Sequence, residues 1–392
     1  MLRRRSVEMP KLEDLLTVVV TTSPVKSNPS TELLEKVFDT FKKCGHDFAY
    51  KCHKVIICDG TRQRDESTTK KHTNDKQSMR NGIVTADQNK NYFAFKQNLK
   101  QLCQEHGEST VLSPFNHTTV SELDVRQGYG FALRHALREC VDTPFVIVIQ
   151  HDRTFMRPTP IAETIRAMWY NSNIKYVGMS MRSNLMMRDQ FLGRYGVSYS
   201  DEMLDCILRP PELLLDAKKY GPNSESAAEI DYEDGGEKLR TNLLALAETY
   251  KGSQQYIDNS EWLKSSNVPG DKCQLSLSPT LFWYDNVHIC ETRHYRDFIF
   301  DPEYRMVVKG GFVEDKLSPV IKKTVERLGL KDGHSRFGCF LLDDYSGFFF
   351  TGHLDGGSYM TPQQKQQLID IHRLSNAKKK KEKRQDKNNA ND

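Results

Sequence analysis

Polar residues follow three apolar segments of the chain, and their types suit the binding of a nucleotide. The segments, each with the residues that follow it, are 15–20 with Thr22, 54–58 with Asp59, and 145–149 with Gln150 and Asp152. Short apolar runs rich in β-branched residues predict buried strands. Ligands of open α/β sheets lie beyond the carboxyl ends of the strands, so the three ends together predict one site, whereas Asp59-Gly60 alone would be an ordinary turn.

A glycine-containing segment precedes the third of these strands. Arg126 and Gly128 come just before a predicted helix whose apolar stripe is formed by Leu133, Ala136, Leu137 and Cys140. Gly128 either allows close backbone approach to a ligand or only permits the turn before the helix. Arg134 falls on the other face of the helix, where it either approaches a bound anion or is solvated.

Two later groups also carry polar or aromatic side chains. Trp283, Tyr284 and Asp285 could form the floor of a sugar site, because aromatic faces stack on sugar rings, or they belong to a strand with alternating core residues. Glu314 and Asp315 follow a Gly-Gly-Phe stretch and begin a predicted helix at about 315–328, where carboxylates favour the helix dipole in any case.

The segments Arg126–Leu137 and Thr143–Asp152, with the strand ends near Thr22 and Asp59, resemble family-2-like glycosyltransferases of the GT-A fold. Those enzymes have a glycine-containing helix with an arginine and then a hydrophobic strand that ends in an Asp-x-Asp motif. The resemblance covers roughly residues 15–60, 120–185 and, more loosely, 275–355. It implies a nucleotide-diphosphate sugar as donor, with a UDP-sugar expected, and a glycan, protein or small-molecule acceptor.

The resemblance also implies a divalent metal, Mn²⁺ or Mg²⁺, which would stabilise the charge on the leaving diphosphate. Asp152 matches the metal-binding second Asp of the family motif, and Gln150 replaces the first, with no charge of its own. His353 resembles the late histidine that completes the metal's coordination in many of these enzymes. The alternatives are an ion pair of Asp152 with Arg153 or Arg157, and a purely structural histidine.

On the acceptor side, the resemblance assigns the general base to the second residue of the Glu-Asp pair. Inverting transfer needs a carboxylate that takes the proton of the acceptor hydroxyl as it attacks the anomeric carbon. Asp315 fits that role, with Glu314 as the second choice or as an acceptor ligand. The donor residues are then expected to be Thr22, Asp59, Arg126, Gly128, Arg134 and Gln150.

The chain is expected to form one α/β domain with a mixed, mostly parallel central sheet flanked by helices. The domain would span 15–360, with a nucleotide-sugar half at 15–155 and an acceptor half at 156–360 that contains a polar insertion at 196–270 with one short helix. Residues 1–14 would form an N-terminal tail, and 361–392 a C-terminal helix and basic tail. Further strands are expected at 109–112, 306–308 and 348–350.

Composition limits the other classes of function. The 392 residues carry a net charge of +4, too small for a dedicated nucleic-acid binder, and no apolar run is long enough to span a membrane. The nine scattered cysteines indicate free thiols and a cytoplasmic location. Two alternatives to the transferase remain: a catalytically silent carbohydrate-binding or scaffold protein, which Gln150 would favour, and a nucleotidyltransferase, which would need a glycine-rich basic loop after the first strand.

Overall fold

The computed structural model describes residues 9–64, 79, 81–181, 202, 204–221, 236–354, 361, 363, 364 and 366, with the backbone alone at 236–243. Parts of the predicted N-terminal tail and of the insertion, and nearly all of the C-terminal helix and tail, lie outside these residues. Within them, no helix has the length and apolar character needed to cross a membrane.

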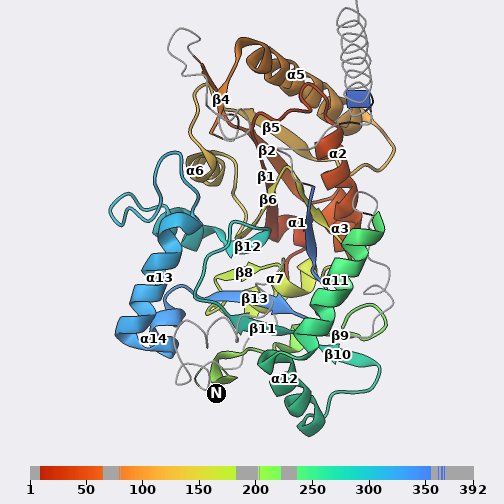
Figure 1. Cartoon of the computed structure of the whole chain (residues 1–392), viewed down its shortest axis with the longest axis vertical. Coiled ribbons are helices and arrows are strands. Elements are labelled where there is room, and N and C mark those ends of the chain that lie inside the picture. The colour runs from red at the N-terminus through yellow and green to blue at the C-terminus, as the bar shows by residue number, and fades with distance from the viewer. Residues whose placement is uncertain are drawn as a thin grey trace, which may run out of the picture.

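An eight-stranded sheet forms the centre of the molecule, in the order β11-β13-β8-β12-β6-β1-β2-β5 (Figure 1). Four neighbouring strands, β5, β2, β1 and β6, are parallel, β8 and β13 are also parallel, and β12 is antiparallel to both of its neighbours. The strands of this sheet are β1 (Leu16–Thr22), β2 (His53–Cys58), β5 (Thr118–Glu122), β6 (Phe145–Gln150), β8 (Tyr176–Gly178), β11 (Ser276–Pro279), β12 (His288–Glu291) and β13 (Cys339–Asp343). The expected mixed, mostly parallel sheet is therefore confirmed.

Short two-stranded pairs complete the β-structure: β3 (Arg62–Gln63) with β4 (Ile83–Val84), β7 (Arg153–Phe155) with β14 (Thr351–His353), and β9 (Leu214–Asp216) with β10 (Lys272–Gln274). The α-helices are α1 (Leu12–Leu15), α2 (Glu32–Asp39), α3 (His46–Tyr50), α5 (Ala86–Glu108), α6 (Tyr129–Glu139), α7 (Ile161–Tyr170), α11 (Gly236–Lys251), α12 (Gln254–Ser265), α13 (Glu314–Leu328) and α14 (Leu330–Ser335). In the described part of the chain, the 3₁₀ turns Thr40–Cys44 and Pro211–Leu213 and the π-helix His294–Ile299 lie between them.

Helices cover both faces of the sheet, as Figure 1 shows with α6 and α13 on one side and α2 and α3 on the other. Side chains alternate between the faces along each strand. In β6, Ile147 and Ile149 pack into the cluster that contains α2, α5 and α7, whereas Val146 and Val148 pack into the cluster that contains α6 and α13. This two-sided burial explains why the strand reads as one continuous apolar run.

Several elements differ from the expectation. Residues 109–112, 306–308 and 348–350 are not strands; the structure instead has β5 at Thr118–Glu122 and β13 at Cys339–Asp343. Tyr345 and Gly347 adopt positive φ angles of 60° and 77°, and this turn keeps the aromatic run Phe348–Phe350 out of a strand. In the part of the insertion that the structure describes, α12 follows α11, so the helical structure extends beyond the one short helix expected.

Candidate functional site

The sheet changes its direction of growth between β1 and β6. From β1 the chain adds β2 and β5 on one side, and β6 then pairs with the other side of β1. Crevices at such a switch point, beyond the carboxyl ends of the strands, are where open α/β sheets bind ligands. The two ends are joined by a hydrogen bond of 3.3 Å from the backbone N–H of Ser23 to Nδ1 of His151.

Asp152 and His353 meet at this switch point, although 201 residues separate them in the chain. Antiparallel pairing of β7 with β14 places His353 opposite Arg153, and Nε2 of His353 lies 3.0 Å from Oδ2 of Asp152. Burial favours the neutral acid, but the hydrogen bond from His353 and the neighbouring side chains of His151, His353 and Arg153 hold the pKa of Asp152 well below its usual range. The carboxylate is therefore ionised at neutral pH.

The donor atoms of this pair fit a divalent cation that shares its coordination with a substrate. Among the described residues, no three His, Cys, Asp or Glu side chains gather into a complete metal site. Asp152 and His353 supply one carboxylate and one imidazole, a set that suits Mn²⁺, and Mg²⁺ and Mn²⁺ sites commonly take their remaining ligands from phosphate oxygens and water. The alternative partner Arg157 is instead paired with Asp344.

Asp59 holds the loop that precedes α6. Its two carboxylate oxygens accept hydrogen bonds from the backbone N–H groups of Gly60, Gln127 and Gly128 at 2.8–2.9 Å. Burial raises the pKa of Asp59, although the three N–H donors oppose that shift. All three donors are backbone N–H groups. The Asp59 carboxylate therefore fixes the position of residues 126–128 beside the ends of β1 and β2.

The loop before α6 lies directly against the Gly-Gly segment that precedes α13. Gly128 has a φ of 79°, and a Cβ atom there would lie 2.5 Å from Cα of Gly310. The N–H of Gly310 donates to the carbonyl of Gln127, and the N–H of Gly130 donates to the carbonyl of Gly311. The backbone approach predicted at Gly128 is thus an approach to another loop of the chain.

The two arginines of the predicted donor site are placed differently. The Arg126 side chain passes over Gly82, where a Cβ would lie 2.5 Å from its Cδ atom, and its positive charge opposes the rise that burial causes in the pKa of Asp59. Arg134 lies on α6 with its guanidinium 3.9 Å from the centre of the Phe131 ring. The parts of Arg126 and Arg134 in donor binding both stay predictions.

Gln150 and Glu314 are connected through Asp285. Nε2 of Gln150 donates to the carbonyl of Asp285 at 2.7 Å, and Asp285 and Glu314 each donate a backbone N–H to the other's carboxylate at 3.0 Å. Asp285 is only 4% exposed, and burial followed by the charge of Glu314 raises its pKa well above the ordinary value. This chain of bonds ties the first turn of α13 to the end of β6.

Asp315 is exposed on that first turn, and its Oδ2 accepts the backbone N–H of Phe312 at 3.0 Å. The ring of Phe312 is 44% exposed beside it and lies 5.1 Å from the ring of Tyr129. The predicted base is therefore open to an approaching molecule, next to an exposed aromatic face.

The acceptor prediction is wrong for Trp283. Its side chain is 1% exposed and packs among the rings of Tyr176, His288 and Tyr295, with centroids 4.4–5.5 Å away. A buried indole has no face left for a sugar, so the alternative, a core residue, holds. Asp285 is also turned inward to Glu314, and Tyr284 is half-buried.

Two residues of the site were missed from sequence. His151 lies between the two polar residues already singled out, and burial lowers its pKa, so the ring is neutral when it accepts the Ser23 N–H. The Tyr129 hydroxyl is buried beside Gln150, and its pKa is raised by burial and then by the charges of Asp285 and Glu314, while Gln150 opposes that shift. The position of Tyr129 at the start of a glycine-preceded helix was the only available signal.

No family model and no curated protein sequence matches the chain. Its fold is similar to parts of solved structures, among them S. aureus TarS 1–349 in complex with UDP-GlcNAc, with 12% identity, a TM-score of 0.24, and coverage of 43% of this chain and 34% of that one. Another is glucosyl-3-phosphoglycerate synthase from Mycobacterium tuberculosis with Mn²⁺, UDP and glucosyl-3-phosphoglycerate, with 12% identity, a TM-score of 0.24, and coverage of 46% and 50%. The chain thus matches half or less of the length of these proteins, and the functional argument rests on its own residues.

Proposed function

We propose that this protein is a glycosyltransferase that moves a sugar from a nucleotide-diphosphate donor, a UDP-sugar, to an acceptor hydroxyl with inversion. The observation that carries the proposal is the ionised Asp152 beside His353 at the β1–β6 switch point. A carboxylate and an imidazole in that position are the groups that a diphosphate-bound cation needs from the protein.

Asp152 and His353 would hold the divalent metal, which supplies Lewis-acid stabilisation of the departing diphosphate. The surrounding residues orient the donor. Asp59 fixes the loop that carries Arg126, whose guanidinium provides a second positive charge near the strand ends.

Asp315 would take the proton of the acceptor hydroxyl, since its carboxylate is exposed at the start of α13. Glu314 and Asp285 position that turn by their reciprocal hydrogen bonds, and Gln150 fixes Asp285 to the end of β6. Donor and base are therefore held by one continuous set of contacts.

The test is isothermal titration with UDP and with GDP, each with and without Mn²⁺. We expect Mn²⁺-dependent binding of UDP by the wild type, and at least 10-fold weaker binding by Asp152→Asn and His353→Gln. Asp271→Asn, an exposed carboxylate in a turn far along the chain, is the matched control and should bind like the wild type. A wild-type protein that binds neither nucleotide under any condition contradicts the proposal.

The second candidate is a protein that binds the nucleotide sugar but does not transfer the sugar. It is favoured because Gln150 replaces a carboxylate, and its amide group donates a hydrogen bond to the Asp285 carbonyl. Hydrolysis of a bound UDP-sugar in the presence of Mn²⁺ distinguishes the two. Metal-dependent UDP binding with no hydrolysis and no transfer would favour the second candidate.

A further inference from the structure

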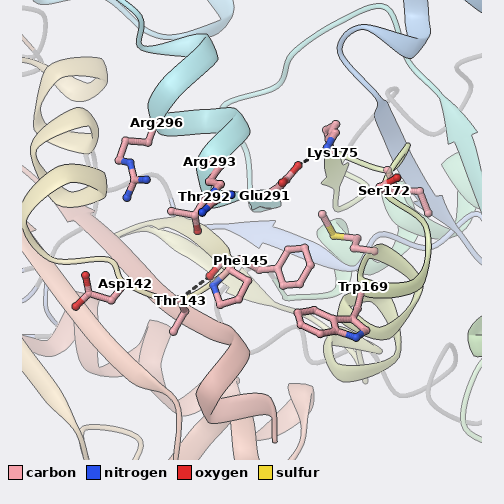
Figure 2. Close-up of a pocket in the computed structure, with 13 residues that line it drawn as sticks. Asp142, Thr143, Phe145, Trp169, Ser172, Lys175, Glu291, Thr292, Arg293 and Arg296 are labelled. Atoms are coloured by element: carbon pink, nitrogen blue, oxygen red, sulfur yellow. Dashed lines mark hydrogen bonds and ion pairs between the residues drawn. The ribbon is translucent and has the colours of Figure 1, made fainter. Parts of the chain in front are cut away.

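A pocket of about 500 Å³ opens at the end of the sheet where β6 begins (Figure 2). Phe145, the first residue of β6, lines it, whereas Gln150, the last residue of that strand, belongs to the β1–β6 crevice. The volume falls in the range of small-molecule sites. The pocket is separate from the crevice, so a ligand bound in it would be independent of the proposed glycosyl transfer.

One part of the pocket is apolar and ends in an exposed aromatic ring. Phe145, Met168 and Ile174 contribute buried apolar side chains to the lining. Trp169, at the end of α7, is 40% exposed, and its ring lies 6.5 Å from that of Phe145. An indole that is supported by a buried ring and open on its outer side can stack against a flat or sugar ring.

The other part is charged. Lys175 forms a 2.5 Å ion pair with Glu291, and Arg296 is bound to Asp297 by two hydrogen bonds. Arg293 lines the same pocket and is exposed, and among the described residues its guanidinium has no hydrogen bond or ion pair. An unpaired guanidinium beside an apolar wall suits a phosphate or carboxylate group, which it binds through two parallel N–H donors.

Thr292 adds a buried polar group without a partner. The residue is 3% exposed, and its backbone N–H donates to the carbonyl of Pro144, but its hydroxyl has no hydrogen-bond partner in the described structure. Figure 2 shows Thr292 and Arg293 along one side of the pocket, across from Thr143 and Phe145. Buried hydroxyl groups normally find a partner, so a ligand hydroxyl is a suitable one here.

We propose that this pocket binds a small phosphorylated ring compound, with the phosphate on Arg293, a ring hydroxyl on Thr292 and the ring against Trp169. A sugar phosphate is the simplest compound that carries all three groups. Lys175 is paired with Glu291 and Arg296 with Asp297, so the anion would bind at Arg293, the lining cation without a hydrogen bond or ion pair in the described part of the chain.

The test is isothermal titration of the full chain with glucose 6-phosphate, with glucose and inorganic phosphate titrated separately as its two halves. We expect glucose 6-phosphate to bind, and each half to bind at least 10-fold more weakly. Arg293→Gln and Trp169→Ala should each weaken binding at least 10-fold, the loss of one charge-assisted contact or one stacked ring. Arg336→Gln, which removes an exposed charge elsewhere, is the matched control and should have no effect.

Three outcomes would overturn the proposal: no binding of glucose 6-phosphate at millimolar concentration, equal binding by Arg293→Gln and the wild type, or binding of inorganic phosphate as tight as that of the ester. Loss of glucose 6-phosphate binding in Asp152→Asn would also overturn it, because it would place the compound in the β1–β6 crevice. Thermal melting of each variant establishes that the fold is intact.

Discussion

Asp285 and Glu314 each donate a backbone N–H to the carboxylate of the other, at 3.0 Å in both directions. This pair joins the loop before β12 to the first turn of α13, two segments that meet only in the folded chain. Because Gln150 also binds the Asp285 carbonyl, the position of Asp315 depends on the end of β6.

Replacing Glu314 by Ala should lower the free energy of unfolding by about 1–2 kcal/mol, because the Asp285 N–H loses its acceptor. Glu314→Gln keeps an oxygen for that N–H, so its cost should be less than half as large. Urea denaturation measures both, with Glu326→Ala on the exposed side of the same helix as a control within about 0.5 kcal/mol. Equal stability of Glu314→Ala and the wild type would show that the pair does not fix α13.

Replacing Asp315 by Asn should lower kcat for sugar transfer at least 100-fold and leave the affinity for UDP unchanged. Asn keeps an oxygen for the Phe312 N–H but cannot take a proton from the acceptor. Steady-state kinetics, with titration of UDP and Mn²⁺, separate the two quantities. Wild-type kcat in this variant would remove Asp315 from the mechanism and leave metal-dependent donor binding untouched.

Three strands buried on both faces were predictable from sequence, whereas the edge strand β5 and the buried strand β13 were not. The runs that form β1, β2 and β6 are continuous and apolar, so their limits were found to within a residue or two. β5 consists of Thr118–Glu122 at the edge of the sheet, where polar side chains are partly exposed, and it has no comparable pattern.

The features of the candidate site also divide into those that could be predicted from sequence and those that could not. Asp152 and His353 were each predicted as metal ligands, and pairing of β7 with β14 places them together. The bond between Asp285 and Glu314 could not be predicted, because it depends on how a loop and a helix 29 residues apart meet in space. Trp283 was ambiguous, since a core strand and an aromatic sugar platform have the same residue types.

Gly128→Ala should lower the free energy of unfolding by about 1–3 kcal/mol more than Gly45→Ala does. Both glycines precede a helix at positive φ, 79° and 103°, with ψ near 165°. A Cβ at Gly128 meets the Gly310 backbone at 2.5 Å, whereas nothing lies within 4 Å of one at Gly45, so only the first adds overpacking to the backbone strain. Urea denaturation gives the difference, and equal values would show that the two loops separate without cost.

Trp283→Ala should lower the free energy of unfolding by about 3–5 kcal/mol, the cost of a large core truncation. Trp283→Phe keeps an aromatic ring against Tyr176 and Tyr295 and should cost much less. Tyr304→Ala, whose side chain is 59% exposed, should stay within about 1 kcal/mol of the wild type. A Trp283→Phe variant with native stability but a strongly raised KM for the acceptor would reinstate Trp283 as an acceptor residue.

Ionisation of Asp343 should lower the free energy of unfolding as the pH rises from 5 to 7.5. Burial raises the pKa of Asp343 to about 7, at the end of β13, where Tyr250 of α11 and Gln255 of α12 donate hydrogen bonds to it. Between its ordinary pKa near 3.8 and about 7, the folded chain keeps a proton that the unfolded chain releases, so stability falls with rising pH across that window. The expected loss from this group is about 2 kcal/mol between pH 5 and 7.5.

Asp343→Asn cannot titrate, so its unfolding free energy should lack this contribution. The variant loses an acceptor for Gln255 and is expected to be less stable than the wild type at pH 5, with the difference narrowing by about 2 kcal/mol at pH 7.5. Urea denaturation of both proteins at the two pH values measures the difference directly, and other titrating groups cancel because they are common to both. If the difference in unfolding free energy between the two proteins is the same at pH 5 and 7.5, Asp343 is ionised over this whole range. In that case α11 and α12 pack on a charged carboxylate, which the hydrogen bonds from Tyr250 and Gln255 stabilise.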